Sequence, residues 1–312
     1  MSGPYVLVPI ELTDAMLSSS TIAEPAASET AYNPLTNYAV GAEAILASTH
    51  RVYTNLLGGV NATSPELALT GATPRWLDTR PTLRWAAFDS QVSTQSTAVT
   101  PLTYVVLPGL INAIAFYGLD GTTLSISIKD APGGTVIYTN TIDLTEPPLD
   151  YYDYYFGRIK SLTKAVIKDL VPYANPEVTI TITAGVGVTV KAGMIAFGDL
   201  RALLSTGEIG GTLTGAKAKP VTYSYISTDA FGTTSIVRRT AATDLDITAQ
   251  VPTSDADAAL ATIQEVLDIP AAWIGSDTAN FTGLNVFGLA SGDVSYEGPT
   301  YSIITINVRG LI

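Results

Sequence analysis

Short segments in which apolar and polar residues alternate recur through the middle of the chain. Residues 124–128 (LSISI) place three branched apolar side chains on one side and serines on the other, which is the pattern of an antiparallel strand with one buried face. The alternation returns at residues 135–139 and 178–182, and the run 132–134 (PGG) supplies a turn. This many short strands predicts a β-sandwich or jelly roll.

A different pattern follows a stretch rich in glycine, threonine and alanine at residues 203–220, which predicts a domain boundary. Residues 254–257 (SDAD) resemble a helix capping box, and the apolar residues after them recur at helical spacing. A helix that ends before Pro270 is therefore expected. Strands are expected on both sides of it, at residues 221–227, 235–239, 244–251, 282–288 and 301–308.

The first 75 residues are less regular. Residues 5–10 predict a strand that adds to the sheet edge of a neighbouring subunit, and residues 13–37 predict an extended arm or, alternatively, a mobile terminus. Residues 38–49 predict a short helix, although Gly41 weakens it, and residues 51–57 predict a strand.

Together these patterns predict a mainly β chain in which a jelly-roll or β-sandwich domain is followed by a smaller α+β domain. The predicted divisions are an N-terminal arm with short elements at residues 1–75, the sandwich at residues 76–212, and the α+β domain at residues 213–312.

Composition adds to this picture. Only 14% of the 312 residues are charged, against roughly 25% in an average soluble protein, which suggests that neighbouring subunits cover much of the surface. The net charge of −12 argues against binding to nucleic acid. No apolar run is long enough for a membrane helix and the N-terminus has no basic segment before its apolar run, so neither membrane insertion nor secretion is expected.

The densest chemistry lies at residues 74–89, which hold two of the three tryptophans. We expect a clamp in which Arg80 or Arg84 stacks on a tryptophan and pairs with an aspartate, either within the chain or between subunits. A second basic pair ends a predicted strand and suggests an edge or interface. The candidate interface residues are Trp76, Asp78, Arg80, Arg84, Trp85, Asp89, Arg238 and Arg239.

A run of aromatic residues occupies positions 150–158 (DYYDYYFGR). In one interpretation alternate rings fill the sandwich core. In the other, the rings form a surface that contacts a glycan or a protein, because tyrosine packs through its ring and forms hydrogen bonds through its hydroxyl. The candidate glycan-contact residues are Tyr151, Tyr152, Tyr154 and Tyr155.

Catalytic motifs are missing from the sequence. The chain has one histidine, His50, without a recognisable nucleophile motif, and it contains no cysteine, phosphate-binding loop or zinc-protease motif. Two carboxylates, Asp150 and Asp153, are too few to predict a calcium site. We therefore predict a protein that is not an enzyme and has no cofactor and no metal.

Residues 76–89 (WLDTRPTLRWAAFD) resemble a block, W-x-D-x-x-P-T-N-R-W-x-M-F-D, of structural proteins from tailed bacteriophages, with Leu83 and Ala87 in place of the usual asparagine and methionine. The C-terminal part, with its segments 231–239, 270–275, 286–288 and 308–311, is similar to a phage tail or baseplate module. The resemblance implies a virion protein near the tail tip with a jelly roll of the carbohydrate-binding-module type, and it does not imply that sugar binding is retained.

The sequence thus predicts a structural virion protein of the tail tip or baseplate, assembled in the host cytoplasm. Its expected partners are other tail proteins and further copies of itself in a symmetric ring. The alternatives are a receptor protein that binds a host-surface glycan, and a capsid decoration or neck protein.

Overall fold

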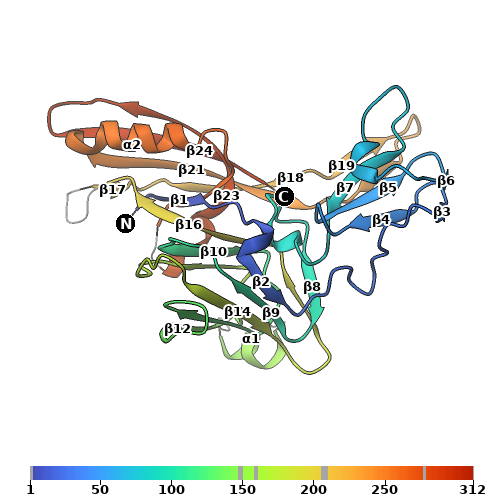
Figure 1. Cartoon of the computed structure of the whole chain (residues 1–312). Helices are drawn as coiled ribbons and strands as arrows, with labels where there is room; N and C mark the ends of the chain where they lie inside the picture. The colour runs from blue at the N-terminus through green and yellow to red at the C-terminus, as the bar shows by residue number, and fades with distance from the viewer. Residues whose placement is uncertain (1–2, 147–149, 158–160, 205–209, 277–278, 312) are drawn as a thin grey trace.

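The protein is described here by a computed structural model that covers residues 3–146, 150–157, 161–204, 210–276 and 279–311, and it consists mostly of antiparallel strands (Figure 1). The predicted fold class is confirmed: the chain is mainly β, with a sandwich followed by a smaller α+β unit. The helical elements in this part of the chain are α1 (Tyr151–Phe156), α2 (Thr253–Glu265) and the 3-10 turns η1 (Asp14–Met16), η2 (Pro65–Leu67), η3 (Ala86–Phe88) and η4 (Ala279–Leu284).

One large antiparallel sheet runs through most of the molecule. In spatial order its strands are β13 (Lys164–Ile167), β10 (Ala113–Tyr117), β16 (Met194–Ala202), β1 (Tyr5–Pro9), β22 (Ala271–Ile274), β23 (Asn285–Ser295), β24 (Tyr301–Gly310), β21 (Ala241–Pro252) and β17 (Gly211–Thr212). A further strand, β18 (Lys217–Thr222), also pairs with β21.

Strand β1 joins the two halves of this sheet. Val6 lies opposite Arg201 of β16 on one side and opposite Trp273 of β22 on the other. The sequence correctly predicts a strand here, but its partners belong to the same chain and not to a neighbouring subunit. The N-terminal strand therefore holds the sandwich and the C-terminal unit in one continuous sheet.

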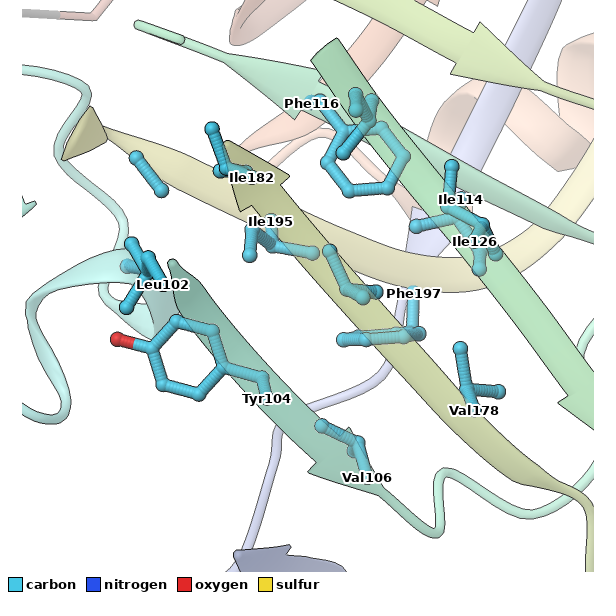
Figure 2. Packing of buried hydrophobic residues seen from close by; sticks show 14 of the residues in the cluster. Leu102, Tyr104, Val106, Ile114, Phe116, Ile126, Val178, Ile182, Ile195 and Phe197 are labelled. Atoms are coloured by element: carbon cyan, nitrogen blue, oxygen red, sulfur yellow. The ribbon is translucent and has the colours of Figure 1, made fainter. Parts of the chain in front are cut away.

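A second sheet covers one face of β13, β10 and β16. Its strands, in order, are β12 (Val136–Asp143), β11 (Thr123–Lys129), β14 (Glu177–Thr183), β9 (Leu102–Val106) and β2 (Leu17–Ser20). Figure 2 shows side chains of both sheets meeting between them, including Tyr104 of β9, Ile182 of β14, Phe116 of β10 and Phe197 of β16. Each such buried side chain contributes about 1.5–3 kcal/mol to folding, so this core accounts for much of the sandwich's stability.

The alternating segments predicted as strands form as expected in β11 and β14, whose buried and partly exposed residues alternate. The ribbon β8 (Ser96–Val99) with β15 (Thr189–Ala192) is a separate pair. Strand β10 is buried along its whole length because its other face packs on a further cluster that includes Leu7, Ala272 and Phe287.

A small unit is formed by β4 (Glu43–Leu46), β5 (Arg51–Asn55) and β7 (Trp76–Pro81), with a pair of short strands beside them, β3 (Asn37–Tyr38) and β6 (Gly59–Val60). The helix predicted for residues 38–49 is wrong, because the segment forms β3 and β4 around Gly41, whose φ of 83° suits a turn. β5 pairs with β7, so this unit combines strands from both sides of the boundary predicted between residues 75 and 76.

In the C-terminal unit, α2 packs on β21, β23 and β24 through Ala256, Ala259 and Ile263. The helix ends before Pro270, as expected, but the predicted capping box does not form. Pro252 is the N-cap residue and makes no side-chain cap, and the Ser254 hydroxyl instead donates to Asp255. The helix begins one residue before the expected cap because Pro252, the last residue of β21, directly precedes it.

Candidate functional site

The two tryptophans of the 76–89 block belong to two different cores. Trp76 is buried in the small unit, where its ring meets Tyr38 edge-on at a centroid distance of 5.1 Å. Trp85 belongs to the sandwich core and stacks on His50, with centroids 4.3 Å apart. The block therefore links the small unit to the sandwich.

The ion pairs of the block differ from the predicted clamp. Arg51 donates to Asp78 at 2.8 Å, and Arg80 pairs with Glu43 at 3.0 Å and Glu29 at 3.5 Å. Within the described residues, the cation that lies over an aromatic ring is a lysine and not an arginine. Within the chain the predicted pairs do not form, because Arg51 is the partner of Asp78, and Glu43 and Glu29 are the partners of Arg80; a clamp between subunits stays a prediction.

Of the remaining two charged candidates of the block, Asp89 has local hydrogen-bond partners, whereas Nε of the Arg84 side chain is buried without a hydrogen-bond partner in the described part of the chain. Asp89 accepts hydrogen bonds from the backbone N–H of Gln91 at 2.8 Å and from the hydroxyl of Thr94, and burial raises the pKa of its carboxyl. The backbone carbonyl of Arg84 accepts from the Tyr104 hydroxyl at 3.1 Å. The role of all six block residues in assembly remains a prediction, and Trp76 and Trp85 are buried within the chain.

A buried polar group beside the block was not found by sequence reasoning. Glu24 accepts a hydrogen bond from the Thr82 hydroxyl at 2.6 Å and contacts Nδ1 of His50 at 3.0 Å. Its signal in the sequence is weak, since these residues lie 26 and 58 positions apart from Glu24. Among these contacts no hydroxyl is paired with the imidazole as a nucleophile. The contacts of Glu24 therefore hold the N-terminal segment against the block.

A β-ribbon, called the arm below and comprising residues 223–240, extends beyond the large sheet. It contains β19 (Tyr225–Thr228) and β20 (Thr234–Val237), which pair with each other, and Figure 1 shows the ribbon projecting from β18. Arg238 and Arg239 lie at its base and are exposed. Its large exposed apolar residues are Tyr225, Ile226, Phe231, Ile236 and Val237.

The tyrosine run forms the short helix α1, which does not enter the core. The rings of Tyr151, Tyr152, Tyr154 and Tyr155 are between 68% and 86% exposed. The interpretation in which alternate rings fill the sandwich core is therefore wrong, because the run coils into a helix in the connection between β12 and β13 instead of pairing as a strand.

Four rings of α1, those of Tyr152, Tyr154, Tyr155 and Phe156, contact one another, and together with the exposed ring of Tyr151 they are called the α1 patch below. Tyr152 lies 5.2 Å from Phe156, and Tyr155 lies 5.1 Å from Tyr154 and 6.4 Å from Phe156, all measured between ring centroids. The ring contacts limit the freedom of the side chains while leaving most of their surface open. Such a patch offers flat apolar faces next to phenolic hydroxyls.

Neither a metal site nor a membrane helix is evident in the described part of the chain. No group of three or more His, Asp or Glu side chains gathers there to hold an ion. None of the helices described has the length and apolar character that crossing a membrane requires.

Comparison with known proteins gives little further information. No protein-family model and no curated protein matches the chain. Among solved structures, a chitosan-binding module of a chitosanase/glucanase from Paenibacillus sp. IK-5 is similar over 36% of this chain and 82% of its own, with 12% identity and a TM-score of 0.24. A fucose-binding module from Streptococcus pneumoniae is similar over 37% of this chain and 83% of its own, with 11% identity and a TM-score of 0.27. At these scores the likenesses decide nothing about this chain's function.

Proposed function

We propose that this chain is a non-enzymatic attachment protein that holds a glycan on the α1 patch, at the tail of a bacteriophage particle. The observation that carries the proposal is the exposure of five aromatic rings on six consecutive residues, between 68% and 86% for each ring. An exposed apolar cluster of this kind is unfavourable in water and usually marks a binding surface.

The size of the α1 patch favours a small ligand. A stable protein–protein interface takes about 800 Å² and roughly 20–30 residues from each partner, whereas the patch comprises one short helix. Ring faces can cover the C–H faces of a sugar, while the phenolic hydroxyls donate to and accept from its hydroxyl groups. A few sugar units of a surface polysaccharide match that area and that chemistry.

Glycan-array binding of the intact chain tests the proposal. The double variant Tyr152→Ala/Tyr154→Ala should lose at least tenfold in affinity for the glycan that the wild type binds, because two rings of the patch are removed. Tyr225→Ala is the matched control, since this tyrosine is 59% exposed and lies on the arm. Absence of binding to any glycan, or full binding by the double variant, would overturn the proposal.

A second candidate function is structural assembly in the phage particle, as a tail-tip or baseplate subunit or, alternatively, as a capsid decoration or neck subunit. The arm favours it. A two-stranded ribbon without a core is marginally stable in water, yet the arm extends with its large apolar side chains exposed, and Phe231 at the tip is 95% exposed. Contact with another subunit would bury these side chains and stabilise the ribbon.

Light scattering coupled to size exclusion tests this second function. The wild type should form a defined oligomer, and Phe231→Ser/Ile236→Ser should shift it to monomer, because both changes remove apolar contacts. Val186→Ser is the control, since Val186 is fully exposed on the turn before β15. A wild type that remains monomeric, alone and with isolated virion proteins, counts against assembly.

A further inference from the structure

A cavity of about 520 Å³ lies where the sandwich, the C-terminal unit and the base of the arm meet. Tyr117 and Lys164 line it from β10 and β13, Phe287 from β23, and Thr240 from the base of the arm. Its volume falls within the roughly 300–1,000 Å³ that small-molecule pockets occupy. It does not include any residue of the α1 patch.

Lys164 is the unusual member of the lining. Its Nζ donates to the backbone carbonyl of Asn285 at 2.7 Å, and burial lowers the pKa of its amine. Lys164 also lines an adjacent cavity of about 160 Å³, and neither lining includes an aspartate or a glutamate. In a chain with 28 acidic and 16 basic residues, a half-buried lysine with no carboxylate beside it among the described residues is unexpected, since buried lysines are usually paired.

The neighbours of Lys164 hold the amine in position. Asn285 is buried and, in addition to accepting from Lys164, accepts from the hydroxyl of Tyr117 through its side-chain Oδ1. Burial raises the pKa of Tyr117, which keeps this phenol protonated as a donor. An ammonium group has three N–H donors, so the one hydrogen bond to Asn285 leaves donors for a ligand.

The rest of the lining is mixed in character. Ser93, Gln95 and Thr163 provide hydroxyl and amide groups, while Val92 and Phe287 provide apolar surface. A ligand that satisfies this set carries an anionic group for the amine, hydroxyls for the polar side chains, and some C–H surface for the aromatic ring.

We propose that this cavity binds a small hydroxylated carboxylate of the size of an acidic monosaccharide, with Lys164 as the anchor of its carboxylate. The site is separate from the α1 patch and does not depend on the proposed attachment function, because it uses different residues and a different ligand chemistry.

Calorimetric titration of the full chain with glucuronate tests the site. The wild type should bind glucuronate at least tenfold more tightly than glucose, which lacks the carboxylate, and than acetate, which lacks the hydroxylated ring. Lys164→Met keeps the length of the side chain and removes its charge, and should weaken glucuronate binding at least tenfold. Lys191→Met, which changes a lysine that pairs with Asp120 and does not line the cavity, should leave binding unchanged.

A second variant keeps the test decisive if Lys164→Met fails to fold. Val92→Trp fills the cavity from its partly exposed rim and should also abolish glucuronate binding. The proposal is overturned if the wild type does not bind glucuronate, if glucose binds equally well, or if binding survives in whichever of the two variants folds. Loss of glycan-array binding in the α1 variant with intact glucuronate binding would separate the two sites.

Discussion

Two hairpins of this chain have similar apolar content and opposite surroundings. In β11–β12, the side chains of Leu124 and Ile126 enter the sandwich core and are almost completely buried. In β19–β20, Ile226 and Ile236 lie opposite each other and are 62% and 59% exposed. The strand pattern in the sequence is the same in kind, but the apolar side chains of the first hairpin are buried inside the chain, whereas those of the arm lie on its surface.

The largest expected effect comes from replacing one aromatic ring in the sandwich core and one on the arm. Phe197→Ala, in the core, should lower the free energy of unfolding by about 3–5 kcal/mol because it removes a buried ring and leaves a cavity. Phe231→Ala, at the tip of the arm, should change it by less than about 0.5 kcal/mol. Chemical denaturation of the isolated chain measures both, and equal losses would show that the arm is part of the folded core.

The junction of the small unit and the sandwich should come next. Trp85→Ala removes the ring that stacks on His50 and should destabilise the chain by about 3 kcal/mol. Leu77→Ala is a control in the same block, since this side chain is 54% exposed. Thermal unfolding tests the prediction, and a stable Trp85→Ala chain that still assembles into particles would show that the block is not a structural brace.

A smaller effect is expected at the join made by β1. A Cβ at Gly198 would lie 2.0 Å from the carbonyl oxygen of Val8, so Gly198→Ala should push β1 away from β16 and destabilise the chain by about 1–3 kcal/mol. Gly185→Ala meets its nearest atom at 3.6 Å and is the matched control. Hydrogen exchange should show faster exchange in β1. Unchanged protection there would contradict a structural role for this strand.

The smallest expected effect is a pH dependence at Asp89. Burial raises the pKa of this carboxyl above its ordinary value of 3.8, so the unfolded chain ionises first and stability falls as the pH rises through the folded-state pKa. Asp89→Asn should therefore be more stable relative to wild type at pH 7 than at pH 3.

Denaturation at the two pH values measures the Asp89 effect. Asp293→Asn, at an exposed position of β23, serves as the comparison. A stability difference between Asp89→Asn and wild type that is the same at both pH values would refute the role assigned to burial.

Local pattern was sufficient to predict the sandwich strands. In β11 and β14 the alternation of apolar and polar residues coincides with the alternation of burial, so the sequence pattern identifies the buried face of each strand. The helix α2 was also predictable because its apolar spacing and the following Pro270 agree. The segment around Gly41 was not, since its strands depend on pairing with distant residues and not on local preference.

The candidate sites were harder to predict for a similar reason. The tyrosine run was visible in the sequence, but its exposure depends on where the loop between β12 and β13 lies. The cavity beside Lys164 brings together residues from six separate segments, and no sequence pattern near position 164 predicts it. The partner of β1 could not be predicted from the sequence either. A strand that pairs within its own chain and a strand that adds to a neighbouring subunit's sheet have the same residue pattern.

The proposal that the α1 patch binds a glycan is tested most directly by glycan-array binding of three full-length proteins: the wild type, Tyr152→Ala/Tyr154→Ala, and Phe231→Ser/Ile236→Ser. The wild type and the arm variant should bind the same glycan, and the α1 variant should not bind it. Binding by the α1 variant at the level of the wild type would contradict the claim that the exposed tyrosines are the attachment surface.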